Sequence, residues 1–136
     1  PALGLPDART IYESAAIVSF LVAAHPDKHM SPELGSPAYG EFMSLLHLMS
    51  TELYPMIDLG YYGALHGAPP AGEETSAWAR DRIDFYWRML EKRLTATGPW
   101  LMGKEYSALD PYAFMISSWY KPSAQALYGK YPAVAK

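Results

Sequence analysis

The residues with the clearest potential for chemistry are Glu13 and Ser14, which come directly before an apolar segment at 15–24. The start of a helix presents backbone N–H groups without partners and the positive end of the helix dipole, and both attract anions. A carboxylate beside a hydroxyl at that place suits a zwitterion, with the ligand carboxylate at Ser14 and its ammonium at Glu13. The pair also fits a plain helix start, in which Ser14 is the N-cap and Glu13 a surface residue.

Other residues with ligand chemistry are few. The chain has no Cys, which excludes a disulfide framework and a zinc–thiolate site. The histidines show no ligand spacing, so we expect no metal. They are His25, His29, His47 and His66.

Length and charge restrict the classes of protein further. A chain of 136 residues suggests one domain, and its net charge of −3 without a basic run argues against a nucleic-acid partner. No apolar segment reaches the length of a membrane span, and 15–24 lacks the flanks of a signal peptide. We therefore expect a cytoplasmic protein that binds neither nucleic acid nor membrane.

The elements that would position Glu13 and Ser14 are mostly helical. Residues 1–12 have the composition of short strands, and a loop is predicted at 66–72. The helix after Ser14 has hardly any polar side chain, so we expect it to be buried on several sides. Helical periodicity predicts helices at 14–24, 38–60, 74–97, from 107 to before Pro122, and from about 123 onward, where Gly129 and Pro132 interrupt the last helix.

The two long predicted helices differ in pattern. The helix at 38–60 carries an apolar arc wider than one core contact needs, which suggests a second buried surface, either a subunit contact or a ligand pocket. Pro55 should kink or break this helix. The helix at 74–97 is amphipathic, with Asp84 and Arg88 spaced as an ion pair. Gly98 and the proline after it should end this helix.

The next predicted helix begins with Ser107 and Asp110, which have the spacing of a capping box, followed by Pro111. An acidic side chain in the first turn offsets the helix dipole and accepts a backbone hydrogen bond. We interpret Ser107 and Asp110 as a structural cap and not as catalytic groups.

Two stretches of sequence, in a fixed order, carry a family resemblance. The first comprises residues 1–3 (PAL), 10–17 (TIYESAAI) and 20–21 (FL), and the second comprises 98–103 (GPWLMG) and 106–110 (YSALD), with Trp119 after it. The first resembles the end of the glutathione-binding domain of glutathione S-transferases. The second resembles the start of the sixth helix in the all-helical domain of that family. The resemblance therefore covers essentially the whole chain.

The resemblance implies a mostly α fold: a glutathione-transferase C-terminal-type helical bundle with a remnant, short strands and one helix, of a thioredoxin-like α/β domain. It places this remnant at 1–25, a linker at 26–37, and the all-helical domain, truncated at its end, at 38–136. Complete members of the family carry an upstream strand–helix–strand unit, so we expect this chain to be a fragment.

The family's glutathione-binding positions fall on four residues of this sequence. By resemblance, Glu13 and Ser14 hold the γ-glutamyl end of glutathione, Pro1 is the family's cis-proline, and Leu3 lies near the backbone that pairs with the cysteinyl part. The hydrophobic substrate pocket would be lined by Met49, Tyr54 and Met43. For each of these three, ordinary helix-bundle core is the alternative.

The implied activity is that of a glutathione transferase, which joins the glutathione thiolate to a small hydrophobic electrophile. The family's thiol-activating residue lies near its first strand, and the resemblance places that strand upstream of this sequence. We therefore assign no catalytic residue here and expect the 136-residue segment alone to be inactive. Glutathione is the only cofactor-like ligand implied, and a homodimer is the expected assembly. The alternative is a non-enzymatic glutathione-transferase-like module that serves in protein assembly.

Overall fold

The computed structural model describes residues 1–61 and 71–135, and most of these are helical, as predicted. Most of the loop predicted at 66–72 lies outside the described residues. Among the described residues, no helix is both long enough and apolar enough to cross a membrane. The elements in chain order are β1 (Ala2–Gly4), β2 (Thr10–Tyr12), α1 (Ser14–Ala24), η1 (Pro26–Lys28), α2 (Pro37–His47), η2 (Leu48–Leu53), α3 (Tyr54–Tyr61), α4 (Glu73–Thr97), α5 (Leu109–Ser117) and α6 (Ala124–Lys130).

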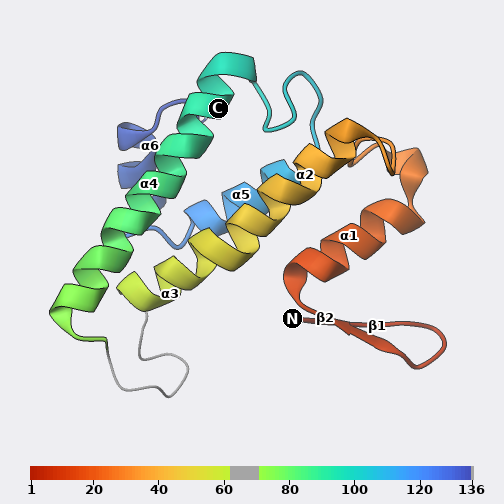
Figure 1. Cartoon of the computed structure of the whole chain (residues 1–136), viewed down its shortest axis with the longest axis horizontal. Helices are drawn as coiled ribbons and strands as arrows, with labels where there is room; N and C mark the ends of the chain where they lie inside the picture. Colours follow the sequence, from red (N-terminus) through yellow and green to blue (C-terminus); the bar gives the residue numbers. More distant parts are fainter. Residues whose placement is uncertain (62–70, 136) are drawn as a thin grey trace.

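The chain opens with a small antiparallel hairpin. Ala2 pairs with Tyr12 and Leu3 with Ile11, so the first residue of the chain lies beside the residue that precedes α1. The turn is closed by the backbone N–H of Leu5, which donates to the carbonyl of Arg9 (2.8 Å). Figure 1 shows the N-terminus next to the end of β2, where α1 begins.

Helix α1 is covered only in part by its neighbours, and the prediction that it is buried on several sides is wrong. Ala15 and Val22 are buried, whereas Phe20 and Leu21 are exposed. The reason is the arrangement of neighbours: α1 packs mainly against α2 and the hairpin, and these leave part of its surface uncovered. An apolar sequence alone does not reveal how many neighbours a helix has.

The helix predicted at 38–60 is a helical rod in three sections, α2, η2 and α3. Its middle section is π-helical, with the N–H of Tyr54 donating to the carbonyl of Met49. Pro55 has no N–H and its ring crowds the carbonyl four residues earlier, so the wider turn lets the chain stay helical. The disturbance expected at Pro55 therefore takes the form of a π-helical section directly before it.

The wide apolar arc of this rod does not leave a second apolar surface. Five of its side chains are fully buried in the bundle core: Phe42, Leu46, Met49, Leu53 and Ile57. The remaining large apolar side chains between 37 and 61 are half-buried. They pack against the same core, so the arc is wide because helices cover the rod on more than one side.

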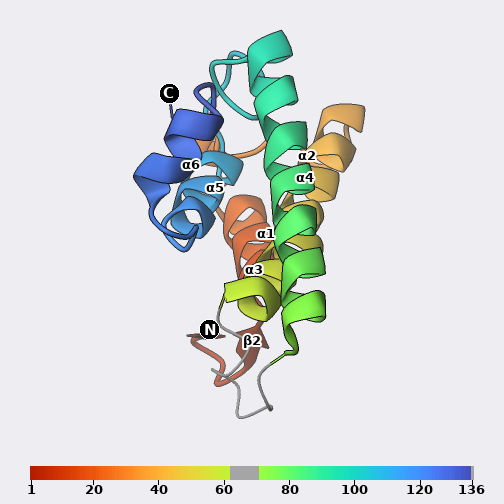
Figure 2. The same ribbon diagram turned by 90° about the vertical axis from the view of Figure 1, so that its left-hand side faces the viewer.

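The long helix α4 lies on the side of the bundle opposite α1 (Figure 1) and packs against α3. Its Ile83, Trp87 and Leu90 share a buried face, as the sequence pattern predicts. Figure 2 shows α5 and α6 on one side of α4 and α2 on the other. The helix ends at Thr97, as predicted, because Pro99 disfavours a helical conformation at Gly98. Position 98 requires glycine, since a Cβ there would collide with the carbonyl oxygen of Leu94.

Helix α5 is shorter than the sequence suggests, whereas α6 ends between Gly129 and Pro132, where an interruption is predicted. Helix α5 ends at Ser117, where the hydroxyl of Ser117 donates to the Phe114 carbonyl (2.7 Å) and that of Ser118 to the Met115 carbonyl (2.6 Å). Such local bonds compete with helix continuation. Helix α6 starts where predicted, with the Ser123 side chain accepting the N–H of Ala126 (3.2 Å).

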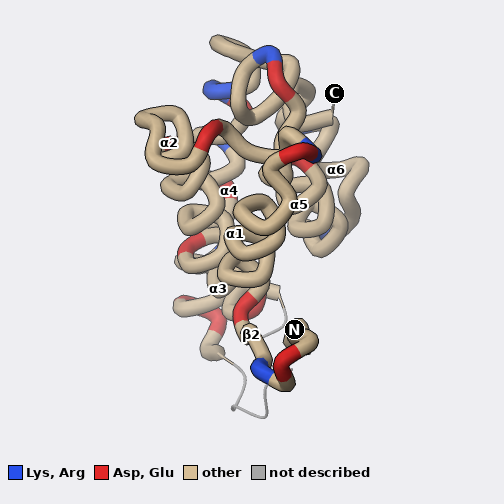
Figure 3. Tube along the Cα trace, turned by 90° about the vertical axis from the view of Figure 1, so that its right-hand side faces the viewer, with Lys and Arg blue, Asp and Glu red and all other residues tan. Residues whose placement is uncertain are grey.

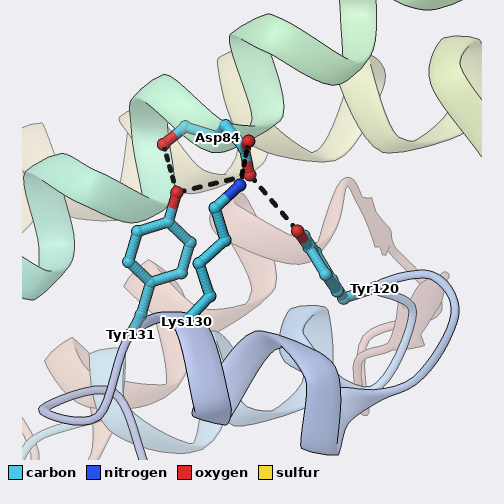
Figure 4. A network of polar contacts seen from close by, with 4 residues as sticks. All are labelled: Asp84, Tyr120, Lys130 and Tyr131. Carbon is cyan, nitrogen blue, oxygen red and sulfur yellow. Dashed lines mark hydrogen bonds and ion pairs between the residues drawn. The ribbon is translucent and has the colours of Figure 1, made fainter.

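Asp84 of α4 joins α6 instead of the predicted partner Arg88. Its carboxylate pairs with Lys130 and accepts the Tyr120 hydroxyl (3.2 Å), and its carbonyl accepts the Tyr131 hydroxyl (3.1 Å), as Figure 4 shows. The i,i+4 spacing permits a pair along one helix, but the docked α6 offers Asp84 closer donors.

Along the described trace, Lys and Arg are interspersed with Asp and Glu (Figure 3).

Candidate functional site

Glu13 and Ser14 lie at the junction of β2 and α1. Glu13 precedes the helix with φ 68° and ψ 125°, and its carbonyl accepts the N–H of Ile17 (2.9 Å), the first bond of the helix. Its side chain makes no capping bond, so Ser14 is the first helical residue and not the N-cap of the plain alternative. A positive φ at a residue with a Cβ costs free energy and is frequent at functional sites.

The two side chains differ in their surroundings. The Glu13 carboxylate is exposed, whereas Ser14 is half-buried. The Ser14 hydroxyl oxygen lies 2.8 Å from the hydroxyl oxygen of Tyr112, a buried residue of α5 that is 98 positions away in the chain. A free carboxylate therefore stands next to a hydroxyl whose direction is set by a second helix.

Tyr54 lies close to the same place. Burial raises the pKa of its hydroxyl, and the negative charges of Asp58 and Glu13 add to this effect. Its ring centroid is 5.0 Å from that of Trp119. The Tyr54 hydroxyl is therefore protonated at neutral pH and is available as a neutral hydrogen-bonding group near Glu13.

The hairpin brings Pro1 to the site. Because Ala2 pairs with Tyr12, Pro1 lies beside Glu13 at the same end of the hairpin, and Leu3 is half-buried two residues further along. Three of the four residues assigned to glutathione by resemblance, Pro1, Glu13 and Ser14, are thus neighbours. Leu3 is the farthest from α1.

The residues expected to line an electrophile pocket differ in burial. Met49 is fully buried in the bundle core, Met43 is half-buried with its sulfur 3.6 Å from the Ser19 hydroxyl, and Tyr54 is half-buried. A cavity of about 410 Å³ lies elsewhere, between α4, α5 and the segment at 99–106. Of the three, Tyr54 and Met43 are accessible in part, and Met49 is not.

Ser107 and Asp110 form a compact polar group before α5. The Asp110 carboxylate accepts the backbone N–H of Ser107 (2.8 Å), the Ser107 hydroxyl (3.2 Å) and the backbone N–H of Leu101 (2.8 Å). The Ser107 hydroxyl oxygen accepts the N–H of Leu109 (3.3 Å). These bonds tie the start of α5 to the preceding loop and leave the carboxylate directed at backbone.

A metal site does not form from the groups that the structure describes: residues 1–61 and 71–135 contain no cluster of three or more His, Asp or Glu side chains. Sequence reasoning missed Tyr112 as a neighbour of Ser14. No local pattern marks it, because the contact depends on how α5 packs against α1.

Solved structures of bacterial enzymes share this fold. BphK, a bacterial glutathione S-transferase solved as a ternary complex, superposes with a TM-score of 0.83 at 23% identity. A glutathione transferase from Methylococcus capsulatus does so with a TM-score of 0.83 at 26% identity. A sphingomonad glutathione S-transferase in complex with glutathione gives a TM-score of 0.80 at 24% identity. No family model matches the chain, and no curated protein matches its sequence.

The extent of these similarities is asymmetric. Each covers 99% of this chain but only 64%, 63% and 63%, respectively, of the solved structure. The chain thus spans a little under two thirds of the length of these neighbours. Its fold is that of the glutathione S-transferase family, which confirms the resemblance found in the sequence.

Proposed function

We propose that the protein is a glutathione transferase and that this chain holds the γ-glutamyl end of glutathione. The observation that carries the proposal is the Glu13–Ser14 pair at the start of α1, with a positive φ at Glu13, in a fold shared with a glutathione-bound neighbour. We further propose the domain division of the sequence analysis, with 1–25 as the thioredoxin-like part, 26–37 as linker and 38–136 as the helical domain.

In this proposal the ammonium and the carboxylate of the γ-glutamyl end of glutathione each lie next to a group that binds their charge. The ligand ammonium lies at the exposed Glu13 carboxylate. The ligand carboxylate accepts hydrogen bonds from the Ser14 hydroxyl and from the first N–H groups of α1, which have no partner within the helix. Pro1 and Leu3 lie along the hairpin edge that would face the cysteinyl part.

The chemistry on the electrophile side is less defined by this chain. We propose that Tyr54 and Met43 contribute to the hydrophobic substrate site, with Met49 supporting them from the core. No residue of this chain is assigned the task of lowering the thiol pKa. Conjugation of a small hydrophobic electrophile is the reaction proposed for the full-length protein.

We also propose a homodimer, supported by a row of exposed apolar side chains on α4. Trp78, Phe85 and Met89 are 53%, 40% and 43% exposed. Their spacing of seven and four residues places them on one face of the helix. Exposed apolar groups in a row are typical of an interface with another protein surface.

The proposal is tested by calorimetric titration of the full-length protein with glutathione. Ser14→Ala and Glu13→Gln should each weaken binding by about 1–3 kcal/mol, the cost of losing a charge-assisted hydrogen bond. Ser19→Ala is the matched control, because Ser19 is on the same helix and its hydroxyl donates to the Ala15 carbonyl (2.8 Å). Wild-type affinity in both site variants would reduce Glu13–Ser14 to an ordinary helix start.

Activity is measured with a chlorinated aromatic electrophile and glutathione. We expect turnover by the full-length protein and a higher KM for glutathione in Ser14→Ala. Retention on immobilised glutathione without turnover of any electrophile would favour the non-enzymatic module.

A further inference from the structure

We infer that Tyr112 is a positioning residue that directs the Ser14 hydroxyl proton toward the carboxylate of the bound ligand. The inference rests on the proposed glutathione site, and it assigns a role in that site to a helix of the bundle. The observation behind it is the 2.8 Å distance between the two hydroxyl oxygens, which joins α1 to α5.

The Ser14 and Tyr112 hydroxyls have one proton each to donate, either to each other or to the ligand. A serine hydroxyl donates one hydrogen bond and accepts up to two. A bound carboxylate only accepts, so the single Ser14 proton must point to it. The bond to Tyr112 can persist in that state only if the Tyr112 hydroxyl is the donor. Without ligand, either hydroxyl can donate.

The burial of Tyr112 makes this role specific. Its side chain is 5% exposed, so water has little access to replace Ser14 as the acceptor of its proton. A buried hydroxyl without a partner is costly, which favours the state in which Tyr112 donates to Ser14. Ser14 is then left with its own proton free for the ligand, and its rotamer is held before the ligand arrives.

The start of α5 holds Tyr112 in place. The Asp110 carboxylate, two residues earlier, accepts bonds from Ser107 and from the backbone of Leu101, which anchors the first turn of the helix. Tyr112 follows within that turn. The helical bundle therefore orients Ser14, a side chain that α1 presents to the ligand.

The test is a double-mutant cycle on glutathione binding by the full-length protein. Tyr112→Phe should weaken glutathione binding about three- to tenfold, the effect of one neutral hydrogen bond. In a Ser14→Ala background the same change should have less than about a twofold effect, because the hydroxyl that it orients is gone. Tyr86→Phe is the control: Tyr86 is 6% exposed, and its hydroxyl donates to Glu52 (2.7 Å). It should leave affinity unchanged.

A second probe separates orientation from general loosening of the fold. The tripeptide γ-aminobutyryl-cysteinyl-glycine keeps the ammonium of glutathione but lacks the neighbouring carboxylate. Tyr112→Phe should not weaken its binding. Tyr112→4-aminophenylalanine, which keeps the ring and a donor in the same position, should restore glutathione affinity, and it also serves if the phenylalanine variant folds poorly.

The outcomes separate this inference from the proposed function. If Ser14→Ala weakens binding but Tyr112→Phe does not, the role of Tyr112 is wrong and the glutathione site stands. If Tyr112→Phe has the same effect in both backgrounds, or weakens both tripeptides alike, its role is structural and the inference is wrong. If Ser14→Ala itself leaves affinity unchanged, the proposed site fails and the inference with it.

Discussion

At the scale of single residues, the backbone at Glu13 is the most informative departure from ordinary geometry. A residue with a Cβ at φ 68° and ψ 125° is held there by its surroundings, here by the strand pairing before it and the first helical bond after it. Such conformations cost about 1–3 kcal/mol. In the proposed site this cost is tolerated because the carboxylate is needed at that position.

This cost can be measured by comparing two substitutions at one position. Glu13→Ala removes the carboxylate and keeps the Cβ, whereas Glu13→Gly removes both. Because glycine tolerates positive φ, the glycine variant should unfold with a free energy about 1 kcal/mol higher than the alanine variant. Denaturant titration gives these values. Equal stability of the two variants would show that the backbone of Glu13 is not strained.

Asp110 offers a second prediction at this scale. Asp110→Ala removes the acceptor for two backbone N–H groups and one hydroxyl at the start of α5. We expect the free energy of unfolding to fall by about 2 kcal/mol, the upper range for helix caps. Glutathione affinity of the folded protein should change less than about threefold, well below the effect of a lost charge-assisted bond. Unchanged stability with lost binding would place Asp110 in the ligand site instead.

At the scale of elements, the Asp84 carboxylate of α4 makes several of the bonds that hold α6 and its flanking residues on α4. Asp84 accepts hydrogen bonds from Tyr120, Lys130 and Tyr131, all from the segment after α5 (Figure 4). The hydrogen bond to Asp84 raises the pKa of Lys130. Burial, and then the charge of Asp84, raise the pKa of Tyr120 and Tyr131. All three groups are therefore held in their protonated forms in the folded state.

The pH dependence of stability follows from the direction of these shifts. A group whose pKa is raised by folding contributes stability that is fully present below its unfolded pKa and lost as the pH rises through its folded pKa. The ordinary values are 10.5 for Lys130 and 10.0 for the tyrosines, so stability should decline above about pH 10. Asp84→Asn should lower stability at pH 7 by about 1–3 kcal/mol and make the alkaline decline shallower. Parallel alkaline curves would contradict this assignment.

At the scale of the whole molecule, the exposed apolar row lies on α4. The rod formed by α2, η2 and α3, which the sequence suggested as the source of a contact surface, has its large apolar side chains buried or half-buried. On α4, Phe85 is exposed and stacks under the guanidinium of Arg82, whose carbon lies 4.4 Å from the ring centroid. A contact between two copies is therefore proposed to involve α4.

Light scattering of the full-length protein at micromolar concentration tests this assembly. We expect about twice the chain mass for the wild type, because the apolar row would otherwise face water. Trp78→Glu combined with Phe85→Glu should give the single mass. Phe114→Glu is the control, because Phe114 is 69% exposed but belongs to α5. A monomeric wild type, or a control that dissociates equally, would contradict the role of α4.

The helices themselves were predictable because their determinants are local. The apolar spacing that buries Ile83, Trp87 and Leu90 on one face is written in consecutive turns of α4. The end of that helix at Gly98 and the start of α6 after Ser123 depend on one or two residues each. The position of Glu13 and Ser14 at the start of α1 was also predictable, since a short apolar segment directly follows two polar residues.

Only the tertiary structure decided which groups face one another across the bundle. Whether α1 is covered on one side or several, whether Asp84 pairs along its helix or with α6, and whether Met49 is core or pocket depend on neighbours distant in sequence. The bond between Ser14 and Tyr112 spans 98 residues. Periodicity assigns a residue to a face of its helix, but the partner on the other side is set by packing angles to which many side chains contribute together.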